Sequence, residues 1–307
     1  MKKLKLIIRE IKRIPRLIHS YFIADKIIGG YINVKAKDHR VNLFDYRPDL
    51  QKYNRFNESR YNLGDYLGFV IAEWMLSRKG LSLDTWVNKR KHMKCVGSNI
   101  YAGFQNATVW GSGIICKPDL HTRFNAFLLH YPLTRLDIRA VRGPLTRKIV
   151  LGWGQKCPDV YGDPAILMPL IYQPKLDVKR ELIVIPQFVT EKDFREKYPK
   201  LDIISMNTND YESVIDAIVS SKKVITSSLH AVILSDAYGV PSVLFRGLGK
   251  RNDFKYLDYY YSTGRMKVNI ADSFEEAMLM KPLPLPDLKP LREGLINTFP
   301  YDLWTDS

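Results

Sequence analysis

Short apolar runs alternate with helical stretches along most of this chain, and this alternation constrains the fold more than any other feature. Residues 224–245, VITSSLHAVILSDAYGVPSVLF, show the pattern: an apolar run ends at Thr226, a helical stretch follows, and Gly239 stops it before the next run. Strands that alternate with helices favour parallel sheets, because a parallel connection needs a crossover long enough to hold a helix. The chain is therefore predicted to be an α/β protein.

A proline-rich segment divides this pattern into two parts. The stretch VYGDPAILMPLIYQPK contains Pro164, Pro169 and Pro174, so it is a poor helix or strand and predicts a linker between domains. The length of 307 residues is enough for two domains of ordinary size. We expect an amphipathic segment, an N-terminal domain, a C-terminal domain, and a tail that folds back over both domains, at residues 1–28, 29–165, 166–272 and 273–307 respectively.

The formal net charge of +15 favours anionic partners, and part of this charge lies in the first residues, MKKLKLIIREIKRIPR. Between the basic residues, apolar residues recur at helical spacing: Leu4, Ile7, Ile8, Ile11, Ile14, Ile18 and Phe22. This pattern is typical of a helix that lies on an anionic membrane surface, with a kink at Pro15. The alternative is a helix packed on its own domain with a solvated basic face.

Charges interrupt the N-terminal apolar residues too often for a signal peptide, and no run reaches the length of a membrane-spanning helix. The three cysteines, Cys95, Cys116 and Cys157, form no CxxC pair and predict reduced thiols in a cytosolic protein. We therefore expect a cytoplasmic protein that is peripherally associated with the inner face of the cell membrane. No His, Asp or Glu cluster has metal-ligand spacing, and the P-loop lysine, GxGxxG and DxD motifs are absent, so no metal and no cofactor are predicted.

His230 follows two serines at the predicted start of a helix. The hydroxyl of Ser227 or Ser228 can accept a hydrogen bond from the free amides of the first turn, and these amides with the helix dipole favour an anion. An imidazole in this turn can act as a general acid or base near neutral pH. The alternative is a histidine packed in the core.

The stretch VRGP places Arg142 between a predicted strand at 137–141 and a helix that begins at Pro144 and ends at Gly152. A guanidinium at this point can hold a carboxylate or a phosphate with two hydrogen bonds, and Arg139 and Arg147 lie nearby in the sequence. The alternative is a surface arginine that pairs with a local acidic residue.

Two further turns are candidates for contacts with a ligand. In WGSGI, glycines let the backbone approach a ligand and the serine adds a hydroxyl, although strand-to-helix turns also need glycine for steric reasons alone. YNLGD makes a tight turn into a helix, with Asp65 as its candidate N-cap, or else it is a plain turn. These candidate residues are Gly111, Ser112, Gly113, Asn62, Gly64 and Asp65. Each of the four candidate sites lies where a strand gives way to a helix, and in doubly wound sheets ligands bind at the carboxyl ends of the strands. With two such domains, the crevice between them is the expected pocket.

Six stretches together resemble the polysaccharide pyruvyl transferases, in family order over residues 61–245: YNLGDYL, VWGSGI, VRGPLTR, VYGDPAILMP, the pair Ile185–Pro186, and SSLHAVILSDAYGVPSV. The resemblance implies two Rossmann-like domains in a GT-B-like arrangement. It also implies transfer of pyruvyl from phosphoenolpyruvate to sugar hydroxyls, which gives a cyclic ketal and phosphate.

The same resemblance implies catalytic roles for His230 and Arg142 and substrate contacts for Ser227 and Ser228. Many relatives have histidine where this chain has Gln187, and glutamine cannot supply a proton. Arg246, after the last strand of the motif, completes the predicted substrate-binding set with Arg139 and Gln187. We expect Arg142 and the helix N-terminus to hold phosphoenolpyruvate, and His230 to donate a proton or to polarise the phosphate side.

The predicted acceptor is an oligosaccharide linked to polyprenyl diphosphate, because capsule and exopolysaccharide repeat units are often built on that carrier, and a basic N-terminus would bring the enzyme to it. A GT-B glycosyltransferase that uses a nucleotide sugar is the alternative with the same fold. A nucleic-acid-binding protein would also explain the charge of +15, but no RRM, helix-turn-helix or OB signature is present, so no nucleic-acid partner is expected.

Overall fold

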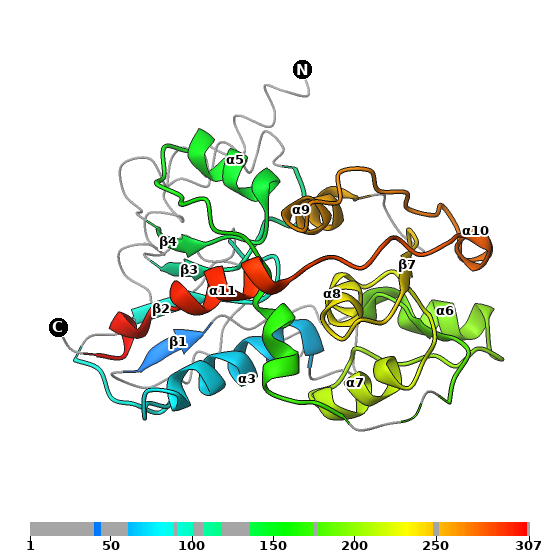
Figure 1. Ribbon diagram of the computed structural model, residues 1–307, viewed down its shortest axis with the longest axis horizontal. Helices are drawn as coiled ribbons and strands as arrows, with labels where there is room; N and C mark the ends of the chain where they lie inside the picture. The colour runs from blue at the N-terminus through cyan, green and yellow to red at the C-terminus, as the bar shows by residue number, and fades with distance from the viewer. Residues whose placement is uncertain are drawn as a thin grey trace, which may run out of the picture.

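The computed structural model describes residues 40–43, 61–88, 91–100, 107–117, 136–174, 177, 179–247 and 252–305 (Figure 1). The predicted amphipathic helix at 1–28 lies outside these residues. Within them the fold is mixed α/β and contains two parallel sheets, as the alternating pattern predicts.

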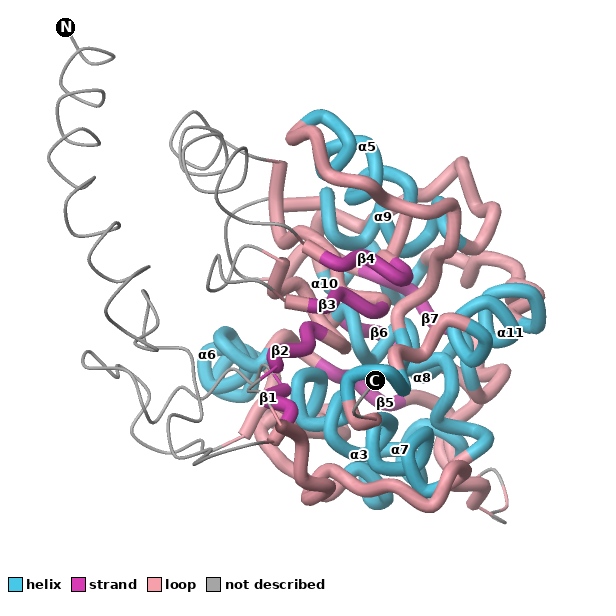
Figure 2. The backbone as a smooth tube through the Cα atoms, turned by 90° about the vertical axis from the view of Figure 1, so that its left-hand side faces the viewer, coloured by secondary structure: helices cyan, strands magenta, loops and turns pink. Residues whose placement is uncertain are grey.

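The first sheet contains four parallel strands in sequential order, and Figure 2 shows them side by side from β4 to β1. The strands are β1 (Val41–Leu43), β2 (Lys91–Lys94), β3 (Thr108–Trp110) and β4 (Asp137–Ala140). A parallel bridge from Val141 to Tyr161 continues the sheet beyond β4. The predicted strand at 137–141 is therefore confirmed to within one residue.

The second sheet contains three parallel strands, β5 (Ile183–Ile185), β6 (Val224–Thr226) and β7 (Ser242–Leu244). Single parallel bridges add Ile203 beside β5 and Ala271 beyond β7. After β5 the chain therefore goes first to one side, at Ile203, and then to the other side, at β6. This reversal is a topological switch point, and in open α/β sheets ligands bind at the carboxyl ends of the strands at such a point.

Eight α-helices and three short 3₁₀ helices occur in the described part of the chain. The α-helices are α3 (Leu63–Ser77), α5 (Pro144–Gly152), α6 (Glu191–Lys197), α7 (Tyr211–Val219), α8 (Leu229–Ala237), α9 (Phe254–Ser262), α10 (Phe274–Leu279) and α11 (Lys289–Asn297). The 3₁₀ helices are η2 (Pro164–Leu170), η3 (Phe188–Thr190) and η4 (Tyr301–Leu303). Helix α5 begins at Pro144 and ends at Gly152, as the sequence predicts.

The proline-rich segment, predicted as a linker between domains, forms the mostly buried 3₁₀ helix η2. Residues 165–168 are fully buried, and η2 packs against both α3 and α8. One hydrophobic cluster therefore contains Trp110 from the first sheet, Met168 from η2 and Val224 from the second sheet. A GT-B-like arrangement is not evident among the described residues, because this shared core joins the two sheets.

The last helices return to the first sheet, and Figure 1 shows the red chain of α11 crossing beside it. The indole Nε1 of Trp110 donates to the carbonyl of Leu295 at 3.0 Å, and the hydroxyl of Tyr301 donates to the carbonyl of Met75 at 2.9 Å. Arg292 ties α11 to the carbonyls of Ile166 and Ala237. Among the described helices, none is long and apolar enough to cross a membrane.

Candidate functional site

His230 lies in the first turn of α8, which follows β6 at the switch point of the second sheet. Its imidazole packs directly on Gly64, in the first turn of α3, because a Cβ at position 64 would lie 1.8 Å from Nδ1. Only glycine leaves room for the ring at this position. The structure thus brings together two of the predicted motifs, YNLGD and SSLH, from the two parts of the chain.

Asp163 faces His230 from the start of η2. Its Oδ2 lies 3.8 Å from Nε2 of His230, and both atoms are enclosed and have no hydrogen-bond partner among the residues that the structure describes. Burial raises the pKa of Asp163 to about 6. Burial, followed by the charges of Lys255 and Arg142, lowers the pKa of His230 to about 3, so its ring is neutral at pH 7.

No group in the described part of the chain caps the first-turn amides of α8. The side chain of Ser228, at the N-cap position, makes no capping hydrogen bond, and the amides of residues 229–231 have no acceptor among the described residues. The hydroxyl of Ser227 accepts from the amide of Gln187 at 2.8 Å instead, so the prediction that a serine caps the turn is wrong. The uncapped amides and the helix dipole favour an anion at this point.

Lys255 places a second positive group beside this turn. It lies in the first turn of α9, its ammonium is 4.8 Å from the ring centroid of Tyr256, and no carboxylate in the described part of the chain pairs with it. Burial and the nearby charge of Arg142 lower the pKa of Lys255 to about 8. A half-buried lysine without an acidic partner adds to the preference for an anion.

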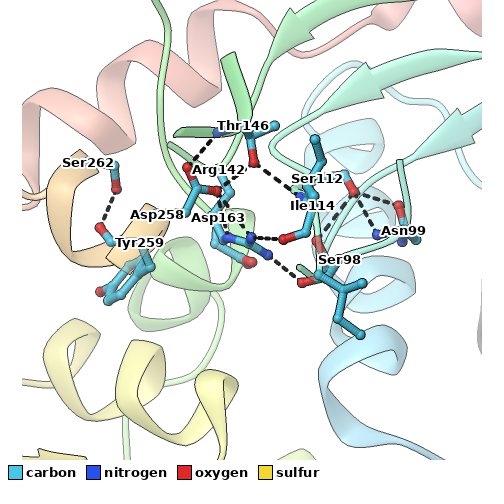
Figure 3. A network of polar contacts seen from close by, with 12 residues as sticks. Ser98, Asn99, Ser112, Ile114, Arg142, Thr146, Asp163, Asp258, Tyr259 and Ser262 are labelled. Carbon is cyan, nitrogen blue, oxygen red and sulfur yellow. Dashed lines mark hydrogen bonds and ion pairs between the residues drawn. The ribbon is translucent and has the colours of Figure 1, made fainter. Parts of the chain in front are cut away.

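Arg142 is fully buried, and its guanidinium contacts protein groups (Figure 3). It donates to Oδ2 of Asp258 at 3.1 Å, to the hydroxyl of Ser98 at 2.5 Å and to the carbonyl of Ile114 at 2.6 Å. Asp258 also accepts from the amide and the hydroxyl of Thr146, at the start of α5. These contacts hold α9 against α5. A role for Arg142 in donor binding stays a prediction.

The WGSGI turn packs in the protein interior, where its two glycines make room for side chains of neighbouring residues. A Cβ at Gly113 would lie 2.3 Å from Cζ of Arg142, and a Cβ at Gly111 would lie 2.3 Å from the ring of Pro164. The hydroxyl of Ser112 donates to Oδ1 of Asn99 at 2.5 Å and is fully buried. These contacts favour the steric alternative for this turn over close approach to a ligand.

The YNLGD turn differs from the prediction at its cap. Helix α3 begins at Leu63, so Asn62 occupies the N-cap position and Asp65 lies within the first turn. The side chain of Asn62 donates to Oδ2 of Asp65 at 2.8 Å. Asp65 is buried against Gly97, whose amide in turn donates to Asp163. This turn therefore lies next to the cluster of polar groups around His230, which contains Asp163, Lys255 and the Arg142–Asp258 pair.

The other predicted arginines do not join this cluster. Arg139 pairs with Asp137 and Asp302 on a partly exposed surface, and Arg246 pairs with Asp253 and Asp272. Arg147 donates to the carbonyl groups of residues 157 and 158. The three cysteines are thiols outside any disulfide; Cys116 is exposed and the other two are buried. No group of three metal-ligating side chains occurs among the residues described.

Three residues of the cluster, Asp163, Lys255 and Asp258, were not predicted as site residues. Asp163 stands between Gly162 and Pro164 in a matching stretch, but nothing local shows that its carboxylate faces a histidine. Lys255 and Asp258 lie in FKYLDYYYS, whose pattern predicts an ordinary amphipathic helix and no site. Their role depends on the packing of α9 between α5 and α8, with Tyr259 donating to Asp236 on the α8 side.

These observations define a class: an α/β protein with two parallel sheets and a basic candidate site at the start of α8. The sequence profile of the polysaccharide pyruvyl transferases matches residues 34–247, well over half of the chain. The chain belongs to the polysaccharide pyruvyl transferase family, as the motifs predict, and membership supports a transferase of polysaccharide biosynthesis.

Two other comparisons find proteins without an assigned activity. The chain is 25% identical over 210 residues to an uncharacterized protein of Acanthamoeba polyphaga mimivirus, covering 64% of this chain and 69% of that protein. A crystal structure of an uncharacterized protein from Klebsiella pneumoniae is similar with a TM-score of 0.44 and 14% identity, covering 73% of this chain and 88% of that one.

Proposed function

We propose that this chain transfers the pyruvyl group of phosphoenolpyruvate to two hydroxyls of one sugar, forming a cyclic ketal and releasing phosphate. The observation that carries the proposal is the uncapped first turn of α8, with His230 within it and Lys255 beside it. Family membership supports the pyruvyl chemistry, and the positive groups of Lys255 and the first-turn amides support an anionic donor.

The donor is a small molecule with a carboxylate and a phosphate. The amides of residues 229–231, the hydroxyl of Ser228 and the ammonium of Lys255 offer donors and positive charge for one of these groups. Because Lys255 has no carboxylate partner among the described residues, an anion that binds there does not have to displace one. Arg142 supports this positive potential from the interior, although its own hydrogen bonds go to the protein.

The reaction needs a group that moves protons. One hydroxyl oxygen bonds to C2 of the enol while C3 gains a proton, and the second hydroxyl then replaces phosphate at C2. The two hydroxyl protons thus end on C3 and on the released phosphate. A neutral imidazole in the cluster is suited to accept a hydroxyl proton, which makes His230 the proposed catalytic residue.

The proposed acceptor is a sugar of a polysaccharide repeat unit carried on a lipid diphosphate. The net charge of +15 and the basic, amphipathic sequence of residues 1–28 support this proposal, since both favour an anionic membrane surface. Removal of residues 1–28 is expected to release the protein from vesicles that contain anionic lipid, and continued co-sedimentation would contradict the membrane role.

Mass spectrometry tests the reaction class. A library of lipid-linked oligosaccharides incubated with phosphoenolpyruvate and the full chain is expected to gain about 70 Da per product, with one phosphate released. His230→Ala is expected to fold and to release no phosphate. A thermal shift with nucleotide diphosphates and none with phosphoenolpyruvate would overturn the proposal in favour of a nucleotide-sugar glycosyltransferase.

A further inference from the structure

Two enclosed polar atoms face each other at the centre of the cluster. Oδ2 of Asp163 and Nε2 of His230 are 3.8 Å apart, and neither has a hydrogen-bond partner in the described part of the chain. Buried polar atoms are rarely left without a partner, because each costs free energy when it is removed from water. A small movement of the imidazole brings these two atoms into hydrogen-bond distance.

The carboxylate of Asp163 is fixed in its orientation. Its Oδ1 accepts from the amide of Ala165 at 3.1 Å, where Asp163 caps η2, and the amide of Gly97 also donates to the carboxylate. The side chain has no solvent exposure. Oδ2 is therefore the oxygen left for His230.

The imidazole is constrained as well. Gly64 leaves room for the ring against the first turn of α3, and Nδ1 is the ring atom nearest to the place that a Cβ would take. Nε2 is enclosed, whereas Nδ1 is not among the enclosed nitrogens that lack a partner. The side chain of His230 is 12% exposed, and the enclosed Nε2 does not account for this exposure. A ring that held one nitrogen on a buried carboxylate and offered the other to a reactant would have the arrangement used to orient catalytic histidines.

We propose that Asp163 is a positioning residue for His230: Oδ2 accepts the proton of Nε2, which leaves the lone pair of Nδ1 free to act as the base. This inference rests on the proposed function for its kinetic consequence only. In one step the first hydroxyl oxygen bonds to C2, the electron pair of the C2–C3 double bond takes up a proton at C3, and Nδ1 relays that proton from the hydroxyl to C3. The second hydroxyl loses its proton as the bond from C2 to the phosphate oxygen breaks, and phosphate leaves with the electron pair and a proton.

The positive charges on the neighbouring elements disfavour a protonated His230, so a negative charge beside the ring is needed when it accepts a proton. Lys255 of α9 and Arg142 after β4 both face His230 and disfavour its protonated form. Ionised Asp163 opposes them; the charge of Arg142 lowers the pKa of Asp163 and that of Asp258 raises it, while Asp163 in turn raises the pKa of the Cys95 thiol. Since the pKa of Asp163 is raised to about 6, the rate of phosphate release should fall as the pH drops below this value, where the carboxylate becomes neutral.

Asp163→Asn tests the inference because the backbone fixes the orientation of the new amide. The amides of Ala165 and Gly97 need an acceptor, so the asparagine oxygen takes the place of Oδ1 and its NH₂ faces Nε2. His230 is then forced into the tautomer that carries its proton on Nδ1, and the base is lost. We expect phosphate release to slow by about 10²–10⁴-fold with little change in donor affinity, and the fall in rate below pH 6 to disappear.

Nitrogen-15 NMR of the His230 ring shows which nitrogen carries the proton, and it needs no bound substrate. The proton of His230 should lie on Nε2 in the wild-type chain at pH 8 and on Nδ1 in Asp163→Asn. Asp236→Asn is the matched control, since it removes another buried carboxylate, which faces Arg265 and Tyr259 instead, and should preserve the His230 tautomer. A wild-type ring protonated on Nδ1 would overturn the inference even if the variant failed to fold. Unchanged phosphate release in Asp163→Asn would overturn it while leaving the proposed function intact.

Discussion

Arg142 and Asp258 form an ion pair in which neither side chain is exposed to solvent, with Nη2 of the arginine 3.1 Å from Oδ2 of the aspartate. The pair joins the loop after β4 to α9, and the same carboxylate caps α5 through Thr146. Helix α9 also carries Lys255, and Tyr256 from the same turn donates to the carbonyl of Ser227 at 2.7 Å. The ion pair therefore holds one wall of the candidate site in place.

Asp258→Asn should destabilise the chain strongly, because it leaves the guanidinium of Arg142 buried without a counter-charge. Removing one partner of a buried ion pair costs about 3–5 kcal/mol. We expect the free energy of unfolding, measured by urea denaturation, to fall by this amount. The matched control is Asp302→Asn, which removes a partly exposed partner of Arg139 and should cost less than about 1 kcal/mol. Equal losses in the two variants would show that the buried pair does not hold α9.

Gly64→Ala should move the imidazole of His230 out of position. The new Cβ would lie 1.8 Å from Nδ1 of His230. Because the hydrogen-bonded backbone of α3 resists displacement, the imidazole has to move. Misplacement of a catalytic group by about 1 Å costs about 100-fold in rate, so phosphate release should fall by this order. Gly68→Ala, one turn further along α3, is the control: its Cβ meets nothing closer than 3.7 Å, and alanine favours the helix. Full activity in Gly64→Ala would remove His230 from this position.

The local structure could be predicted from the sequence wherever neighbouring residues determine it. Pro144 at the start of α5 and Gly152 at its end follow from backbone geometry alone. The pocket expected between the two α/β parts already includes both YNLGD and SSLH, which the structure brings together. The burial and ion pairing of Arg142 could not be predicted, because its carboxylate partner is Asp258, which lies far along the chain.

The role of α9 was missed for the same reason. Its sequence, FKYLDYYYS, predicts an amphipathic helix but not which elements it separates. Lys255 becomes a site residue only because the aspartate three positions later is bound by Arg142 and Thr146. The burial of the proline-rich segment could not be predicted either, because apolar residues that alternate with proline fit a linker as well as a buried 3₁₀ helix.

Lys255→Met should weaken the binding of phosphoenolpyruvate while leaving the fold intact. A hydrogen bond to a charged group contributes about 1.5–3 kcal/mol, so the dissociation constant should rise by roughly 10- to 100-fold in isothermal titration calorimetry. Since the pKa of Lys255 is lowered to about 8, wild-type affinity should also fall as the pH rises through that value, because the ammonium loses its proton. Lys267→Met, at an exposed position, should change neither property. Unchanged affinity in Lys255→Met would place the donor elsewhere.

Asp163→Asn and His230→Gln should change the pH dependence of stability in opposite directions. The pKa of Asp163 is raised from 3.8 to about 6 in the folded chain, so its contribution to stability is present below the unfolded value and is lost as the pH rises through about 6. The pKa of His230 is lowered from 6.5 to about 3, so the unfolded chain takes up a proton first and stability is lost as the pH falls below 6.5.

The two effects offset each other in the wild-type chain between about pH 4 and pH 6. Asp163→Asn removes the first effect, so its stability relative to wild type should increase from pH 4 to pH 7. His230→Gln removes the second, so its relative stability should be highest near pH 4 and decrease towards pH 7. Urea denaturation across this range measures both differences. Stability curves that stay parallel to the wild-type curve would show that neither group is buried with the altered pKa that the cluster requires.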